Sequence, residues 1–181
     1  MEWSVNWWGN WKMRIFKLKH SIIILIITLG LLITVKKVSE KFFLGNEDSC
    51  IYYNDCMIKS EKDSCTYLYS KGTNESGDTD ISFKFSGMDT IWCINSKNEV
   101  DVVFKYNAVI KEGDFKVVLI NPDDSINEII DSSEEGEITH LIKPGKTRVK
   151  IVGNKVSGSL KLRLCCYNKD CNCVEVFSSF I

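Results

Sequence analysis

The sequence is poor in the residues and motifs on which common enzymes rely. Only two histidines and two prolines occur among its 181 residues. The phosphate-binding pattern GxxxxGK[ST], the dinucleotide pattern GxGxxG and the nucleophile pattern GxSxG are all absent. Because acid–base catalysis uses histidine most often, we expect a protein that is not an enzyme. We therefore predict no catalytic residues, no bound metal and no cofactor.

Excess charge of one sign is also lacking, since 23 Lys and Arg stand against 24 Asp and Glu. This balance argues against a strongly basic binder of nucleic acid. The charges are unevenly distributed along the chain, however. Residues 1–44 hold seven basic and two acidic side chains, a net +5, whereas residues 45–181 hold 16 basic and 22 acidic ones, a net −6. The two parts therefore suit different environments.

The N-terminal part contains an uncharged run of fifteen residues, 21–35, with the sequence SIIILIITLGLLITV and lysines on both sides. At about 1.5 Å per residue a helix of this run spans roughly 22 Å, which is shorter than a bilayer core of about 30 Å. Flanking lysine side chains can extend to the interface and make up the difference. A secretory signal competes with a membrane anchor, but no A-x-A-like cleavage site follows the run. We predict a retained signal-anchor.

This reading divides the chain into four parts: a basic segment at 1–20, the transmembrane signal-anchor at 21–35, a tether at 36–50 and a Cys-rich domain at 51–181. Basic residues lie on both sides of the anchor, with four on its N-terminal side, including Arg14, and three on the other. The positive-inside rule then favours a cytoplasmic N-terminus. We expect a single-pass protein of the cell membrane with an extracytoplasmic C-terminal domain. Whether translation starts at Met1 or at Met13 stays open.

The C-terminal part has the texture of an all-β protein. Short runs alternate apolar and polar residues between turn signals, and no long stretch has helical periodicity. We predict nine strands, at 81–85, 90–94, 100–106, 115–120, 126–130, 137–142, 147–152, 159–165 and 173–177. The polar run at 71–80 is predicted to be an exposed loop. The fold expected is an antiparallel β-sandwich, Ig-like or jelly-roll-like, with a closed barrel as the alternative.

Three features of the C-terminal part are distinctive: the segment FKFSG at 83–87, the segment GDFKV at 113–117, and KTRVKIVG at 146–153 followed by SGS at 157–159. By these features residues 83–164 resemble small membrane-anchored or lipoprotein-like β-sandwich domains of low-GC, Clostridium-like bacteria. The resemblance implies a β-sandwich fold. It implies no activity, because such domains are mostly of unknown function and these motifs belong to a fold rather than to a site.

All eight cysteines lie in the C-terminal part of the sequence. In an oxidising compartment an even number of cysteines is typical of a disulfide framework. We predict that at least two bonds join an early group of cysteines to a late group. The candidates are Cys50, Cys56, Cys65, Cys93, Cys165, Cys166, Cys171 and Cys173.

The late group also admits another chemistry. Cys165, Cys166, Cys171 and Cys173 place four thiols within nine residues, which is dense enough for a thiolate Zn²⁺ site. The usual C-x₂-C knuckle is absent, however, and no histidine lies nearby. A thiol- or metal-responsive sensor is therefore the alternative to a disulfide-stabilised binding domain.

Other side chains suggest sites that have simpler structural explanations. His140 is a candidate general base, but a strand histidine that is hydrogen-bonded or exposed on a sheet face is the favoured explanation. The pairs Asp123-Asp124 and Glu134-Glu135 suggest Ca²⁺ ligands or glycosidase carboxylates, but both lie in predicted turns.

Trp92 and Tyr106 are candidate ligand-binding platforms for sugar stacking, with core packing as the alternative. Taken together, the sequence predicts a membrane-tethered extracytoplasmic β-sandwich that binds a ligand or takes part in envelope interactions. The expected partners are the membrane and an envelope polysaccharide or another protein, and no nucleic acid.

Overall fold

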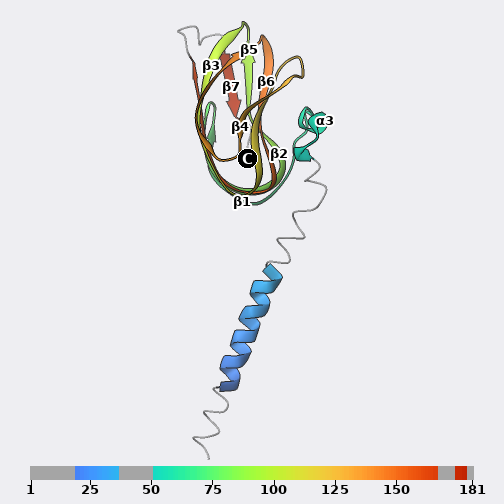
Figure 1. Ribbon diagram of the computed structural model, residues 1–181, viewed down its shortest axis with the longest axis vertical. Helices are drawn as coiled ribbons and strands as arrows, with labels where there is room; N and C mark the ends of the chain where they lie inside the picture. Colours follow the sequence, from blue (N-terminus) through green and yellow to red (C-terminus); the bar gives the residue numbers. More distant parts are fainter. Residues whose placement is uncertain (1–18, 37–50, 167–173, 179–181) are drawn as a thin grey trace, which may run out of the picture. The chain divides into compact units, whose positions relative to one another are not determined.

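The computed structural model describes residues 19–36, 51–166 and 174–178. These fall into two separate units, one within residues 1–43 and the other within residues 44–181. Among the described residues, the first unit contributes the helix Lys19–Lys36 and the second contributes the strands (Figure 1). Each unit is described by itself below.

The N-terminal helix spans Lys19–Lys36 and exposes every one of its side chains. Its two threonines do not interrupt the apolar surface, because each hydroxyl donates a hydrogen bond to a carbonyl of its own helix, from Thr28 to Leu25 at 2.9 Å and from Thr34 to Leu31 at 2.8 Å. A helix that is apolar on all sides is unsuited to water. Its length and composition suit a membrane span and a secretory signal alike.

In the described part of the second unit, the short helix α3 is followed by seven antiparallel strands. These elements are α3 (Asp55–Ile58), β1 (Ser64–Glu75), β2 (Asp78–Ser96), β3 (Val100–Ile120), β4 (Ile126–Asp131), β5 (Glu134–Ile142), β6 (Gly145–Cys166) and β7 (Val174–Ser178).

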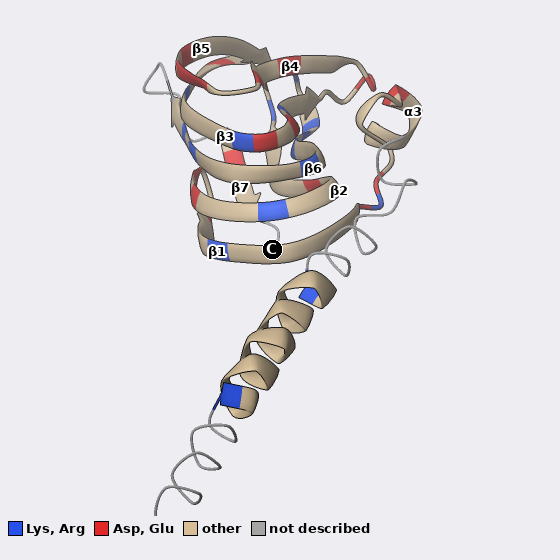
Figure 2. Ribbon diagram, turned by 60° about the horizontal axis from the view of Figure 1, so that its bottom comes forward, with Lys and Arg blue, Asp and Glu red and all other residues tan. Residues whose placement is uncertain are grey.

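Three of these strands, β2, β3 and β6, have about twenty residues each and run through both layers of the fold. Their first layer, here called the first half-sheet, has the order β1-β2-β6-β3-β5, which Figure 2 shows from β1 upward. The second half-sheet has the order β7-β2-β6-β3-β4. The predicted mainly-β antiparallel sandwich preceded by an apolar helix is confirmed, although a single sheet that folds over on itself supplies both layers.

Glycines mark the places where the long strands bend. Gly87 in β2 has φ +110° beside a register shift, and Gly113 in β3 has φ +77° beside another. A side chain at Gly113 would place its Cβ 2.5 Å from the carbonyl oxygens of Asn154 and Lys155. The sequence prediction of nine strands was wrong here, because these glycines are bends inside continuous strands rather than turns between short ones.

The segment 71–80 also differs from the prediction of an exposed loop. It forms the end of β1, a two-residue turn at Ser76 and Gly77, and the start of β2. Gly77 has φ +81°, the backbone conformation that lets so short a turn connect two strands. Polar composition concealed these strands because their exposed side chains are hydrophilic.

The main core lies between the two half-sheets. Phe83 stacks on Phe115 with ring centroids 5.2 Å apart, and Phe85 meets the edge of Phe83 at the same distance. Phe83 belongs to β2 in the first half-sheet and Phe115 to β3 in the second. This aromatic contact therefore joins the two layers directly.

A second, smaller core lies on the outer face of the second half-sheet, under the segment that contains α3. Ile51 and Ile58 of this segment are buried against Met88, Val118 and Val152. Asn54 caps α3 by accepting a hydrogen bond from the Met57 amide at 3.3 Å. Residues 51–58 are thus packed onto the outer face of the second half-sheet.

Buried cations fasten the same segment to the sheet. Arg148 donates to the carbonyls of Lys59 and Ser60, both at 2.6 Å, and Lys150 donates to the Ser60 carbonyl at 2.7 Å. Lys150 also forms an ion pair with Asp63 at 3.0 Å, and its side chain is completely buried.

Candidate functional site

A hollow lies on the outer face of the first half-sheet, and we call it the charged groove. It has a volume of about 570 Å³. Its lining comes from four neighbouring strands, β2, β6, β3 and β5. The lining residues are Asp78, Thr79, Asp80, Lys105, Tyr106, Asn107, Glu135, Gly136, Glu137, Lys161, Leu162 and Arg163.

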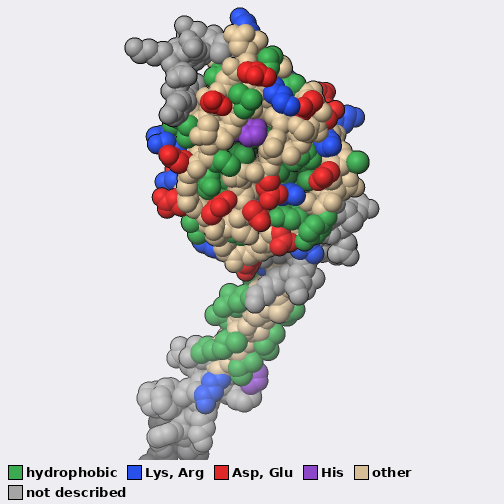
Figure 3. All heavy atoms as spheres, turned by 45° about the horizontal axis from the view of Figure 1, so that its top comes forward, with side chains coloured by type: hydrophobic (Ala, Val, Ile, Leu, Met, Phe, Trp, Pro, Cys, Tyr) green, Lys and Arg blue, Asp and Glu red, His purple; other side chains and the backbone are tan. Residues whose placement is uncertain are grey.

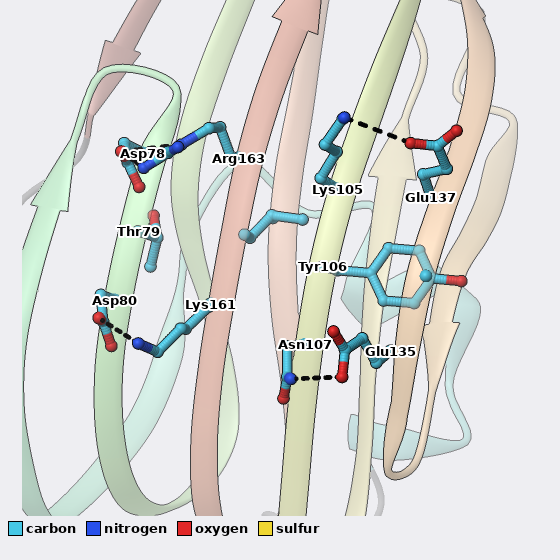
Figure 4. A pocket seen from close by; sticks show the side chains of 12 residues that line it. Asp78, Thr79, Asp80, Lys105, Tyr106, Asn107, Glu135, Glu137, Lys161 and Arg163 are labelled. Carbon is cyan, nitrogen blue, oxygen red and sulfur yellow. Dashed lines mark hydrogen bonds and ion pairs between the residues drawn. The ribbon is translucent and has the colours of Figure 1, made fainter.

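Sheet register arranges the charged side chains in two rows that cross the strands. The first row consists of Asp78, Arg163, Lys105 and Glu137, which are consecutive partners across β2, β6, β3 and β5. Arg163 donates to Asp78 at 2.7 and 3.1 Å, and Lys105 pairs with Glu137 at 3.4 Å (Figure 4). Acidic residues therefore lie at both ends of this row and basic residues at its middle.

The second row lies two residues further along each strand. It consists of Asp80, Lys161, Asn107 and Glu135. Lys161 forms an ion pair with Asp80 at 3.1 Å, and the Asn107 amide donates to Glu135 at 2.9 Å. Side chains in the three ion pairs of the groove are between 50% and 69% exposed, so their polar atoms remain accessible.

The strip between the rows is the floor of the groove. Thr79 and Leu162 lie there with their side chains buried on the core side, and the Thr79 hydroxyl donates to Asn74 at 2.7 Å. The floor at these positions is therefore backbone. At the β5 end, Tyr106 lies beside Gly136, where a Cβ would come within 3.2 Å of the Tyr106 hydroxyl.

Polar and apolar side chains extend the same face beyond the groove. Tyr69 of β1 is 49% exposed and is paired in register with Lys84, which shares the face of Asp80 by strand alternation. Val109 is equally exposed on β3. Tyr69 was not singled out in the sequence, because nothing in its neighbourhood shows which face of β1 is wet.

The two aromatic candidates from the sequence have different positions. Trp92 is completely buried in the main core, and its indole Nε1 donates to Asn74 at 3.1 Å. Neither face of this ring is available to a sugar, which corrects the prediction of a platform at Trp92. Tyr106 lines the groove and packs against the main core. Burial and the charge of Glu134 raise the pKa of Tyr106.

The histidine and one of the acidic pairs take part in local contacts of the fold. His140 is half-buried on β5, and desolvation together with Lys143 lowers its pKa. Asp123 accepts hydrogen bonds from Lys143 and from the amide of Ser125, which lower the pKa of its carboxyl. Glu135 is the exception, because the register of β5 places it in the charged groove.

The predicted disulfide framework is not supported by the described part of the chain. No disulfide joins two of its residues, and Cys56, Cys93 and Cys165 are thiols. Cys93 lies between Arg148 and Phe177 in the sheet, whereas Cys165 lies opposite Val103, so neighbouring strands do not bring these two cysteines together.

Five further cysteines complete the set. Cys65 packs half-buried against the main core. Cys50, Cys171 and Cys173 lie outside the described residues, as does the side chain of Cys166. Within residues 19–36, 51–166 and 174–178, no group of three or more His, Cys, Asp or Glu is arranged to hold a metal ion. The thiolate metal site therefore stays an untested alternative.

Comparison with known proteins identifies no family. No family matches the sequence, and no curated protein matches it either. Among solved structures, the enzymatically active domain of bacteriophage CBA120 tailspike protein 4 shares 8% identity at a TM-score of 0.31, over 64% of this chain and 19% of that one. This chain thus spans about a fifth of that protein.

Two further solved structures have comparably low TM-scores and sequence identities. A CBM29-2 mutant, from the family 29 carbohydrate-binding modules, was solved with mannohexaose and shares 12% identity at a TM-score of 0.30, covering 65% of this chain and 94% of that one. A family two carbohydrate esterase from Cellvibrio japonicus shares 10% identity at a TM-score of 0.27, covering 66% and 35%. Similarity this low does not assign a function.

Proposed function

We propose that this chain is a membrane-tethered, extracytoplasmic β-sandwich that binds an envelope polysaccharide on the outer face of the first half-sheet, without chemical conversion. The observation that carries the proposal is the charged groove. Residues from four strands, far apart in the sequence, form a hollow of about 570 Å³ whose charged side chains remain accessible. A concave site with several convergent polar groups is typical of ligand recognition.

A binding role without catalysis fits the engagement of the acidic groups. Asp78, Asp80 and Glu137 each have a basic partner, and Glu135 accepts from the Asn107 amide. A glycosidase would use two carboxylates in different protonation states, one of them as a general acid. Four carboxylates engaged with cations or an amide favour hydrogen bonding to a ligand over proton transfer to it.

The tether is proposed from the N-terminal helix. Its exposed apolar surface is suited to a bilayer, and the lysines at its two ends, Lys19 and Lys36, suit the two interfaces. The segment with α3 packs on the second half-sheet, on another face of the domain than the groove. The resemblance to membrane-anchored domains of Clostridium-like bacteria stays a prediction.

The test measures retention of the full-length protein, in detergent micelles, on immobilised polysaccharides. In the double variant Asp80→Ala/Lys161→Ala both partners of one groove ion pair are removed, so neither is left unpaired. We expect at least about a tenfold loss of affinity, equivalent to about 1.4 kcal/mol. The matched control is Asp123→Ala/Lys143→Ala, which removes an exposed ion pair that lies outside the groove and should bind normally.

A second measurement locates the ligand. Cys165 lies two residues beyond Arg163 on the same face of β6, whereas Cys56 is exposed on α3 over the other half-sheet. Bound polysaccharide should slow alkylation of Cys165 and leave that of Cys56 unchanged, as followed by peptide mass spectrometry. Equal protection of both thiols, or normal retention of the Asp80/Lys161 variant, would contradict binding at this face.

A further inference from the structure

We infer that the charged groove is selective for an uncharged, hydroxyl-rich polysaccharide that lies across the strands of the first half-sheet. This inference rests on the proposed binding function and adds the chemical class of the ligand. Its basis is the way in which the groove balances its own charges. Four carboxylates and three cations line it, which leaves a net charge of −1.

Charged polymers meet an unfavourable surface here. Each basic side chain, Lys105, Lys161 and Arg163, already lies within ion-pair distance of a carboxylate. A polyanion would have to displace these carboxylates while remaining close to them, and a polycation would approach the three cations. Like charges brought together in this way are a common source of selectivity against the wrong partner. Figure 3 shows acidic and basic side chains similarly interspersed on the face that it presents.

A neutral polymer of hydroxyl groups meets no such conflict. An ion pair leaves most of the hydrogen-bonding capacity of its members unused, because an ammonium has three donors, a guanidinium five, and a carboxylate about four acceptor positions. Hydroxyl groups both donate and accept, so they can add to the ion pairs without breaking them. Hydrogen bonds to charged groups are also stronger than neutral ones.

The geometry of the groove favours a ligand that crosses the strands. The two charged rows run from β2 to β5, perpendicular to the strands, and enclose the backbone strip between them. Four strands at a spacing of about 4.8 Å give a groove of roughly 14 Å, and rows two residues apart are separated by roughly 7 Å. A single extended chain of sugar rings fits between such rows, with polar groups along both of its edges.

The experiment compares polymers that differ in charge. Full-length protein in detergent is tested against neutral polymers (a soluble β-glucan, an α-mannan and a galactan), anionic ones (polygalacturonate and poly(glycerol phosphate)) and cationic chitosan. We expect retention on at least one neutral polymer, with affinity changing less than about twofold between about 50 mM and about 500 mM salt, because few ionic contacts are screened.

A charge variant tests the cause of the selectivity. Glu135→Gln/Glu137→Gln keeps two side-chain acceptors and changes the net charge of the groove from −1 to +1. We expect the ratio of polygalacturonate affinity to neutral-polymer affinity to rise at least about fivefold at low salt, because the polyanion loses two repelling charges whereas the neutral polymer keeps only weaker, uncharged acceptors. The control Glu128→Gln removes an acidic residue of β4, outside the groove, and should leave both affinities unchanged.

The possible failures are distinguishable. Preferential retention of the wild-type protein on an anionic or cationic polymer, with affinity falling steeply as salt rises, would overturn the neutral-ligand inference and leave the binding function intact. Retention on no polymer of the panel would overturn the proposed function itself. If the Asp80→Ala/Lys161→Ala variant binds the neutral polymer as tightly as the wild type does, the charged groove is not the binding site.

Discussion

The side chain of Lys150 is completely buried and is paired at 3.0 Å with Asp63, a residue that is about one-third exposed. Because of this difference in exposure, removing the carboxylate and removing the ammonium should destabilise the fold to different extents. Asp63→Asn leaves a buried ammonium without its carboxylate, whereas Lys150→Met leaves a carboxylate that water still reaches. We expect Asp63→Asn to lower the free energy of unfolding by about 3 kcal/mol and Lys150→Met by less, about 1–2 kcal/mol.

Urea unfolding followed by circular dichroism checks this order. The double variant Asp63→Asn/Lys150→Met should cost less than the sum of the two single changes, because it leaves no unpaired charge. Strict additivity of the two changes would show that Asp63 and Lys150 do not interact energetically.

Asp89 gives the stability a specific dependence on pH. Its carboxyl is largely buried and accepts a hydrogen bond from the Tyr67 hydroxyl at 2.8 Å, and desolvation raises its pKa above the usual 3.8. The folded protein thus binds the Asp89 proton more tightly than the unfolded chain does. The contribution of Asp89 to stability is therefore present at low pH and decreases as the pH rises from 3.8 through the raised pKa.

The variant Asp89→Asn lacks this pH dependence. The free energy of unfolding of the wild type, minus that of the variant, should therefore decrease as the pH rises through that window. Asp123→Asn is the control of opposite sign, because hydrogen bonds from Lys143 and Ser125 lower the pKa of Asp123. Its difference from the wild type should grow as the pH rises towards 3.8. Denaturant titrations across the acidic range measure both differences, and identical slopes for the two variants would rule out this assignment.

Gly113 and Gly77 allow a positive φ angle to be separated from a steric clash. Both have φ near +80°, but an added Cβ at Gly113 would lie 2.5 Å from two carbonyl oxygens, whereas at Gly77 the nearest atom is 3.7 Å away. We expect Gly77→Ala to cost about 1 kcal/mol for the backbone conformation alone. Gly113→Ala should cost several times more or prevent folding.

Thermal unfolding of the two alanine variants measures this difference directly. Comparable melting temperatures for the Gly77 and Gly113 variants would mean that β3 and β6 separate easily at the bend, and that the close approach of the backbones is not required for the fold.

Tyr69 is the aromatic side chain that we expect to contribute to polysaccharide binding on the first half-sheet. Its half-exposed ring is suited to packing against the apolar face of a sugar. Tyr69→Ala should lower the affinity for a retained neutral polymer about five- to tenfold, corresponding to roughly 1 kcal/mol. Tyr53 is 73% exposed and precedes α3, so Tyr53→Ala is the matched control. Calorimetric titration that ranks the two variants equally would exclude Tyr69 from the site.

Short-range patterns in the sequence were sufficient for part of this structure. The uncharged run at 21–35 predicted the helix Lys19–Lys36, and alternation in segments such as 159–165 predicted strands with the correct inward and outward faces. The charged groove was not predictable in the same way. Arg163 and Asp78 are 85 residues apart in sequence, and only the pairing register of β2 with β6 brings them to 2.7 Å.

The sequence by itself determined the apolar helix, the all-β character of the C-terminal part and the separation of charge between them, because these depend on composition and on the periodicity of neighbouring residues. The tertiary structure decided the features that depend on distant segments. It made Gly87 and Gly113 bends rather than turns, buried Trp92, kept Cys93 and Cys165 in separate surroundings, and aligned two charged rows across four strands. Register and bending are set by the packing of the whole sheet, which no local pattern specifies.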